Sequence, residues 1–453
     1  MRLQGAYPFS RGRAWALAAI TLACAPASAA AQPSPAPPPT ATAEGQSRQI
    51  TELQAAQLLM NAGKLAEARV VLADLEKHQP ADNEVQFLLG LIAVQDKDYD
   101  QAIRRFRAIL AREPKAVRVR LELGRAFFLK KDWDNAERQF RFARAGALPA
   151  AARGNVDQYL YAIRELRRWR FDFAIAAAPD TNLNAGPSTT TVDIFGLPFQ
   201  LSPDARRQSG VGLSVDAGAE WSAPISARTR LRLGAQVHRT DYPGSEFDDM
   251  TVAAYAGPRF IRRRWEISPL VTGFRRWYGN QFYNQGVGGS LQAIVYPTRR
   301  LGLSATVGGQ AVTYALKDQS GPSYSGALSF FYTLTPDSIL SGSVSVNRQS
   351  AAVAAYANTA RQVSIAYQRD LPGGFTLSVQ PGYVWLDYDA PLAAFGVPRR
   401  DRQWSVQATV LNRRIDVLGF TPRLAYTYTH NASDISLYRY ERGRAEVGLT
   451  RVF

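Results

Sequence analysis

The clearest strand in the sequence reads RQWSVQATV, from Arg402 to Val410. Every second residue from Trp404 to Val410 is apolar, and the residues between them are Ser, Gln and Thr. Side chains of a β-strand point alternately to its two faces, so this segment has one apolar and one polar face. In membrane barrels the apolar face of such a strand meets lipid and the polar face lines a wet lumen. The segment therefore predicts one strand of a membrane β-barrel.

The same period of two residues returns from Trp169 to the end of the chain. It predicts fourteen strands, at 168–178, 210–222, 228–240, 249–260, 264–276, 283–296, 300–314, 322–334, 338–348, 359–370, 374–387, 401–412, 416–428 and 437–453. An even number of strands puts both ends of the barrel on the same side of the membrane. We therefore expect a membrane all-β barrel of about 14 antiparallel strands over 167–453.

The connections alternate in length. Those after even-numbered strands are short, and those after odd-numbered strands, such as 179–209, 349–358, 388–400 and 429–436, are longer. Short turns are expected in the periplasm and long loops outside. Arginines gather at three short turns, at 262–264, 299–300 and 413–414. They either form a basic rim that contacts anionic head groups or cargo, or they are ordinary interfacial anchors.

A different pattern precedes the barrel. Between residues 50 and 146 similar residues recur at a spacing of 34, for example Gly90 and Gly124, or Phe106 and Phe140. This is the period of the tetratricopeptide repeat, a pair of antiparallel helices. Small residues such as Gly90 are expected where one helix closely crosses its partner. We predict an all-α periplasmic domain over 49–166, with three repeats and a capping helix.

Tetratricopeptide repeats bind peptides in a groove lined by the first helix of each repeat. The residues that could face this groove by their place in the repeat are Gln57, Met60, Leu91, Val94, Arg118, Leu121, Arg125 and Phe128. The alternative interpretation is that the apolar members are core or inter-domain contacts. The sequence leaves both interpretations open.

The N-terminus has the features of an export signal. Arg2, Arg11 and Arg13 precede an apolar run from Ala14 to Ala23, and small residues follow. We expect a signal peptide over 1–31, then a Pro- and Ala-rich linker over 32–48. Cys24 lies in the predicted signal peptide, so the mature chain would contain no thiol.

The remaining composition excludes several kinds of chemistry. The formal net charge is +16, but an export signal argues against a nucleic-acid partner. His78, His238 and His430 are not spaced as metal ligands, and no phosphate-binding loop is present. A barrel phospholipase would need a His and Ser pair on its lipid-facing wall, for which His238 is the nearest candidate. We expect no enzyme activity, no catalytic or metal-binding residues and no cofactor.

Together, an export signal, tetratricopeptide repeats and a fourteen-stranded barrel resemble the surface lipoprotein assembly modifier family (Slam, type XI secretion). The segment after the first strand is similar to the Asn-rich signature that opens that family's barrel, at Pro179, Asp180, Asn182 and Asn184. The terminal Phe453 resembles the signal that the outer-membrane insertion machinery reads, although Arg451 stands where a second hydrophobic residue is usual.

The resemblance implies a function in the outer membrane of a Gram-negative cell. The chain would be a translocation or assembly factor for one protein cargo, either a surface lipoprotein or a secreted haem- or metal-binding protein. The repeats would engage this cargo in the periplasm, and the barrel would assist its passage. The expected partners are thus cargo, outer-membrane lipid and the insertion machinery, and we expect a monomer. The alternative is a porin or polysaccharide-export barrel that carries periplasmic repeats.

Overall fold

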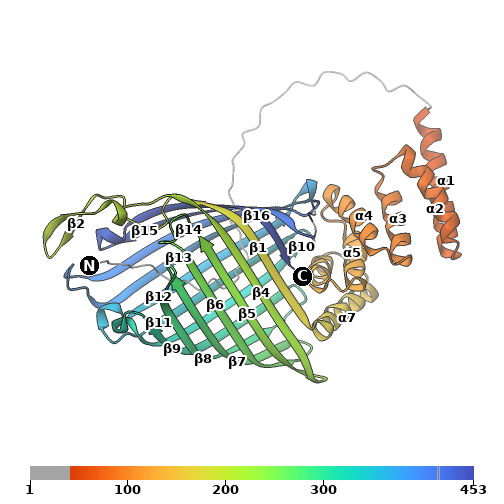
Figure 1. Cartoon of the computed structure of the whole chain (residues 1–453). Helices are drawn as coiled ribbons and strands as arrows, with labels where there is room; N and C mark the ends of the chain where they lie inside the picture. Colours follow the sequence, from red (N-terminus) through yellow and green to blue (C-terminus); the bar gives the residue numbers. More distant parts are fainter. Residues whose placement is uncertain (1–40, 416, 418, 453) are drawn as a thin grey trace, which may run out of the picture.

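The computed structural model describes residues 41–415, 417 and 419–452. The predicted signal peptide and the predicted insertion signal at Phe453 lie outside the described residues. Within them, seven helices precede a closed barrel, and the helices lie against one end of that barrel (Figure 1). Among these residues, no helix has the length and apolar character needed to span a membrane.

The helices form pairs that repeat along the chain. Their bounds are α1 (Ala41–Asn61), α2 (Leu65–His78), α3 (Asn83–Gln95), α4 (Tyr99–Arg112), α5 (Val117–Leu129), α6 (Trp133–Ala145) and α7 (Ala150–Leu166). Helix α4 begins 34 residues after α2, and α6 begins 34 residues after α4. The start of α1 falls inside the range expected to be a linker, and no proline follows Pro39 there to prevent a helix.

Each pair closes through the same turn. Gly63, Lys97 and Lys131, again 34 residues apart, have positive φ angles of 75°, 64° and 65°. The side chains of Asp98 and Asp132 then accept hydrogen bonds from the backbone N–H groups of Gln101 and Asn135. These N-caps satisfy amide groups that have no partner inside the helix. The left-handed residue reverses the chain, and the cap starts the next helix.

The predicted close crossings are present. A Cβ atom on Gly90 would lie 2.5 Å from the ring of Phe106, and one on Gly124 would lie 2.9 Å from the ring of Phe140. Both rings are buried in one core that runs through all the helix pairs. Glycine is therefore required where each aromatic ring packs against the preceding helix.

The predicted fourteen-stranded antiparallel barrel is confirmed. Its strands are β1 (Trp169–Asp180), β4 (Gly210–Ser226), β5 (Thr229–Asp241), β6 (Asp249–Ile261), β7 (Trp265–Tyr278), β8 (Gln281–Val295), β9 (Leu301–Tyr314), β10 (Gly321–Thr335), β11 (Ser338–Gln349), β12 (Asn358–Asp370), β13 (Phe375–Pro391), β14 (Pro398–Asn412), β15 (Thr421–Ser433) and β16 (Tyr440–Val452). Each strand pairs with its neighbours in sequence, and β1 closes the barrel by pairing with β16.

The lipid-facing and lumen-facing sides of the barrel wall differ as the alternation of apolar and polar residues predicts. Large apolar side chains such as Val237, Val271 and Leu328 are exposed on the outside. The residues between them face the lumen and form ion pairs across neighbouring strands, for example Arg232 with Glu220 at 2.7 Å. Apolar groups thus meet lipid, while charged groups are paired inside.

Some connections differ from expectation. Within the long loop after β1, strands β2 (Thr191–Ile194) and β3 (Leu197–Gln200) form a hairpin whose turn residues, Phe195 and Gly196, both have positive φ. The outer connection between β7 and β8 is only Gly279 and Asn280, so the loop-length rule is not strict. Strand β15 begins at Thr421 instead of 416, because residues 417 and 420 pair across a tight turn.

Candidate functional site

The predicted groove residues all lie on the first helices of the repeats, α1, α3 and α5, but few of them are accessible. Val94 is only 5% exposed and belongs to the core, so it cannot contact a cargo. Met60, Leu91, Leu121 and Phe128 are partly buried against that core. Apolar side chains on this face therefore hold the helix pairs together. Gln57, Arg118 and Arg125 remain exposed.

Each of the two exposed arginines lies beside a carboxylate, so this face of the helices carries both positive and negative charge. The guanidinium group of Arg118 lies 4.2 Å from the ring centroid of Phe87 on α3, and its Nη1 lies 3.6 Å from a carboxylate oxygen of Glu84. Arg125 lies 3.6 Å from Glu122 on its own helix. Exposed pairs at this distance are weak and can exchange partners with a bound ligand. We name the face formed by Gln57, Arg118 and Arg125 with these two carboxylates the A-helix surface.

The helical domain is joined to the barrel by a buried ion-pair cluster. Arg120 on α5 is 1% exposed, and its Nη2 donates a hydrogen bond to Asp370 Oδ2 at 3.0 Å. Arg138 on α6 donates to the other oxygen of Asp370 at 2.6 Å. The hydroxyl of Thr376 also donates to Asp370, and Arg413 donates to Thr376. Sequence reasoning missed this contact, because charged residues on a repeat helix are ordinarily exposed.

A second cluster joins α6 to the start of β1. Arg167 Nη2 donates to Glu137 Oε2 at 2.6 Å, and Arg167 Nη1 donates to Asp134 Oδ1. Arg141 also pairs with Glu137. Burial by itself would raise the pKa of Glu137, but the guanidinium groups of Arg141 and Arg167 outweigh it and hold the pKa well below its ordinary value. Burial does raise the pKa of Asp134.

Further contacts spread around the barrel end. Arg164 on α7 lies 3.4 Å from Glu266 on β7, and Arg141 packs over the ring of Phe331 on β10. Arg299 pairs with Asp157, and Arg300 donates to the backbone carbonyl of Ala145. The helical domain therefore contacts β1, β7, β10, β12 and the turn between β8 and β9. These points lie on opposite sides of the barrel, so α6 and α7 lie across its mouth (Figure 1).

The arginine runs at the short turns serve more than one purpose. Arg299 and Arg300 contact the helical domain, and Arg413 donates to Thr376, which in turn donates to Asp370 at the junction. Arg262, in contrast, lies 5.5 Å from the ring centroid of Trp265 and donates to the backbone carbonyl of Ile261 beside it. That arrangement is typical of an interfacial anchor. The turn at 299–300 thus has a role that neither interpretation included, and contact of the rim with head groups or cargo stays a prediction.

The Asn-rich segment closes the barrel at its other end. The carboxylate of Asp180 is 3% exposed and accepts two hydrogen bonds from Arg442 on β16. Asn182 is fully buried and donates to the backbone carbonyls of Gly186 and Glu441. Asn184 donates to the carbonyl of Arg206. Asp180 and Asn182 therefore fix the first strand to the last, and Asn184 shapes the loop that follows.

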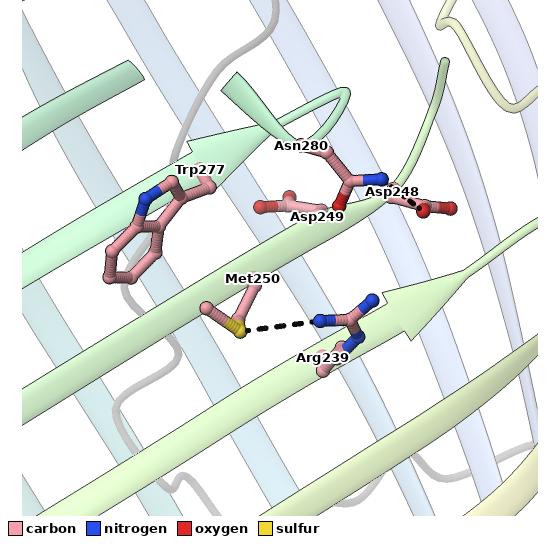
Figure 2. A pocket seen from close by; sticks show the side chains of 6 residues that line it. All are labelled: Arg239, Asp248, Asp249, Met250, Trp277 and Asn280. Atoms are coloured by element: carbon pink, nitrogen blue, oxygen red, sulfur yellow. Dashed lines mark hydrogen bonds between the residues drawn. The ribbon is translucent and has the colours of Figure 1, made fainter. Parts of the chain in front are cut away.

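Figure 2 shows a pocket of about 170 Å³ at the outer end of β5, β6 and β7. Arg239 lies near Met250 in this pocket but its guanidinium group pairs with Asp241. Asp249 pairs with Arg276, and Asp248 accepts a hydrogen bond from Asn280. Each charged group of the pocket thus already has a partner in the barrel, which indicates a structural role for these groups.

His238 faces the lumen and not the lipid, contrary to what a barrel phospholipase would need. Its Nδ1 lies 2.6 Å from Asp216, and its Nε2 lies 3.4 Å from the hydroxyl of Thr240. Thr240 and Ser214 are 2% and 3% exposed, and both hydroxyls contact Arg444. Within the described part of the chain, no three His, Cys, Asp or Glu side chains are placed to hold a metal ion.

Comparisons with known proteins agree with this architecture. A family model described as "Surface lipoprotein assembly modifier" matches residues 169–453, and a model of that family's N-terminal TPR repeats matches residues 54–140. Among solved structures, the outer membrane channel DcaP of Acinetobacter baumannii aligns with 63% of this chain and 96% of its own at 11% identity, with a TM-score of 0.36.

Curated relatives match most of the chain. "Surface lipoprotein assembly modifier 1" of Neisseria meningitidis is 25% identical over 86% of this chain and 80% of its own length. The "Hemophilin secretion modulator" of Acinetobacter baumannii is 21% identical over 83% of this chain and 80% of its own length. As an outer-membrane β-barrel with a tetratricopeptide-repeat domain at its periplasmic end, the chain belongs to the surface lipoprotein assembly modifier family.

Proposed function

We propose that the chain delivers one specific protein cargo, a surface lipoprotein or a secreted protein, across the outer membrane. The helical domain would engage the cargo in the periplasm, and the barrel would assist its passage. The observation that carries this proposal is the docking of the helical domain across the barrel mouth, with Arg118 and Arg125 left exposed on α5. The names of the relatives, a surface lipoprotein assembly modifier and a hemophilin secretion modulator, support both classes of cargo.

The same proposal includes the division of the chain into a signal peptide and two domains. A signal peptide over 1–31 would direct export, and the domains would be the repeats over 49–166 and the barrel over 167–453. Phe453 would be read by the insertion machinery, and the chain would act as a monomer without catalysing a reaction. Ion pairs line the lumen, as in Arg423 with Glu446 and Arg232 with Glu220, and such a wall suits passage of a polar chain.

The A-helix surface can be tested by charge reversal. An Arg118→Glu and Arg125→Glu double variant should reduce cargo on intact cells several-fold, because the two exposed cations would no longer attract cargo. The matched control is Arg104→Glu with Arg153→Glu, which makes the same charge change at exposed positions on α4 and α7. The readout is flow cytometry of a tagged cargo, normalised to the amount of barrel in the outer membrane.

Both double variants should leave barrel abundance unchanged, since exposed substitutions usually alter stability by less than about 0.5 kcal/mol. Equal loss of display in both would point to general charge and reject the surface. Unchanged display in both would also reject it. Conductance of the purified protein in planar bilayers separates the proposal from the porin alternative, for which a constitutively open, large channel is expected.

A further inference from the structure

A trough runs along the lipid-facing wall of β1, β4 and β5, which lie side by side (Figure 1). Its volume is about 540 Å³ and its lining is almost entirely apolar. Ala217, Ala219 and Ala235 contribute small side chains, and Val237 extends this surface. Phe171, Phe173 and Phe420 also line it, and the rings of Phe173 and Phe420 meet edge to face at 5.9 Å.

The strand register explains the trough. Phe171 on β1 lies opposite Ala219 on β4, which lies opposite Ala235 on β5. The row continues through Ala254 on β6 to Gly273 on β7. Large rings at one side of the row and small residues along the rest leave a depression in a wall that is elsewhere covered by Leu, Val and Ile.

The depth of the trough in the membrane follows from the positions of two outward-facing tryptophans. Trp169 on β1 and Trp221 on β4 point outward at the end nearest the helical domain, with ring centroids 6.3 Å apart. Such rings mark the membrane interface. Phe173 lies four residues further along β1, which at about 3.3 Å per residue and a tilt of about 40° is roughly 10 Å deeper. Each leaflet contributes about 15 Å of hydrocarbon, so the trough lies in the periplasmic leaflet.

The trough is also continuous with the helical domain. Helix α7 ends at Leu166, three residues before Trp169. Leu166, Trp169 and Phe171 are 52%, 53% and 42% exposed, so an accessible apolar path leads from the last helix to the trough. A molecule held by the helical domain would have any membrane-embedded part close to this path.

From these observations we propose that the trough receives the acyl chains of a lipidated cargo while the helical domain holds its polypeptide. The inference rests on the proposed function and narrows it to cargo with a lipid anchor. Such a cargo reaches the outer membrane with its acyl chains in the periplasmic leaflet, the level at which the trough lies.

The trough would take up the acyl chains of the cargo in preference to bilayer lipid because the cargo is tethered to the helical domain. Moving an acyl chain from bulk lipid to a protein wall brings no hydrophobic gain, because lipid tails are as apolar as the wall. A cargo held by the helical domain has its anchor confined to the membrane around the barrel, and this confinement raises the effective concentration of the anchor at the trough. Free phospholipid has no such tether, so it occupies the trough only in proportion to its abundance.

The test uses a palmitate that carries a diazirine and an alkyne, fed to cells that express the full chain and a candidate cargo lipoprotein. Light activates the diazirine, and mass spectrometry then maps the crosslinked residues. A lipoprotein adduct joins two polypeptides, whereas a phospholipid adduct adds only a lipid to the barrel, so the two sources of acyl chain are distinguished. We expect lipoprotein adducts on β1, β4 and β5 near Phe171, Ala219 and Ala235.

An Ala219→Leu and Ala235→Leu variant fills the trough and should lower the lipoprotein adduct several-fold. The matched control is Ala305→Leu on β9, at a comparable level of the lipid-facing wall, where the adduct should be unaffected. Phospholipid adducts alone would overturn the inference, and so would lipoprotein adducts spread evenly around the barrel. Either result is measured on the unmodified chain, so the test does not depend on insertion of a variant.

A cargo whose lipid-bearing Cys is replaced by Ser separates this inference from the proposed function. If surface delivery of both cargo forms requires the chain but the filled trough affects neither, the trough is rejected and the proposed function stands. If neither form requires the chain, the proposed function itself fails.

Discussion

Arg120 and Asp370 are 250 positions apart in the sequence, and their side chains meet at 3.0 Å where the helical domain joins the barrel. Both are shielded from water, with exposed side-chain fractions of 2% and 13%. Arg120 also donates to the carbonyl of Pro114 and to Gln139, so its position is fixed by its own repeat. The pair thus ties helix α5 directly to the barrel.

Removing the carboxylate should release the helical domain. In Asp370→Asn the cations of Arg120 and Arg138 would stay buried without a countercharge, and breaking a buried pair costs about 3–5 kcal/mol. We expect faster cleavage between the domains in limited proteolysis of the purified protein. Asp96→Asn is the control, because Asp96 pairs with Arg69 at an exposed site, where such pairs contribute about 0–1 kcal/mol. Equal cleavage of the two variants would contradict a docking role for Asp370.

Acid should weaken the same junction through Glu137. The pKa of Glu137 is depressed in the folded chain, so its contribution is complete above its unfolded pKa of about 4.3 and is lost as pH falls below it. The thermal midpoint of the helices, followed by circular dichroism, should be steady near neutral pH and drop below about pH 4.5. Asp134, with its raised pKa, acts in the opposite direction, so Glu137→Gln is needed to isolate the effect.

Glu137→Gln should be less stable than the unmodified chain at neutral pH, since Arg141 and Arg167 would lose their countercharge. Its thermal midpoint should then depend less on pH in the acid range, and the two curves should converge as pH falls. Parallel curves would mean that other groups cause the acid sensitivity.

Two helical glycines should respond in opposite ways to alanine. In Gly90→Ala the new Cβ would lie 2.5 Å from the ring of Phe106, and overpacking of this kind costs about 1–3 kcal/mol. At Gly154 on α7, an added Cβ would have no neighbouring atom within 4 Å. Gly154→Ala should therefore stabilise the helix by roughly 0.5–1 kcal/mol. Chemical denaturation of the full chain measures both, and a stabilising Gly90→Ala would refute the close crossing.

The barrel seam gives a further prediction. Asp180→Asn leaves Arg442 without its carboxylate, so the barrel should unfold at a lower temperature, with a loss of about 3–5 kcal/mol. Asp387→Asn serves as the control, because Asp387 and its two partners, Arg361 and Arg402, are 30%, 58% and 37% exposed, and such pairs are weak. The shift of band position on heating before gel electrophoresis reports barrel unfolding. An equal midpoint for both variants would show that Asp180 does not hold the seam.

Periodicity made most of the fold predictable, because it reports directly which side of an element is apolar. The alternation at Trp404 and Val406 and the spacing between Gly90 and Gly124 required no knowledge of distant residues. The β2–β3 hairpin was missed because four-residue strands are too short for a pattern to be recognised. The placement of its turn depends on Phe195 taking a positive φ, which is uncommon for that residue type.

The candidate site was less predictable, because its contacts join distant parts of the chain. Arg120 and Arg118 are two residues apart on one helix, yet the first is buried at the barrel and the second is exposed. Repeat position alone does not distinguish them, since the difference arises from which face meets the barrel. The burial of Val94 is likewise not apparent from its place in the repeat, because the core between helix pairs extends further across α3 than the groove pattern implies.

The orientation of the barrel predicts which tags antibodies reach. Loops at 392–397 and 434–439 lie at the end opposite the helical domain, and the turn at Ala227 and Arg228 lies at the same end as that domain. Tags in the two loops should bind antibody on intact cells, because the helical domain is periplasmic. A tag at Ala227 should bind only after permeabilisation.

Ala227 is a better place for a periplasmic tag than the turn at 371–374, because Ala227 is exposed. The turn at 371–374 follows Asp370 directly, so a tag there would disturb the junction with the helices. Each tagged protein should first be shown to insert, by its heat-dependent shift in gel electrophoresis. Antibody binding at Ala227 on intact cells, with none at 392–397, would place the helical domain outside the cell. That result would remove the A-helix surface from the periplasm and with it the proposed route of the cargo.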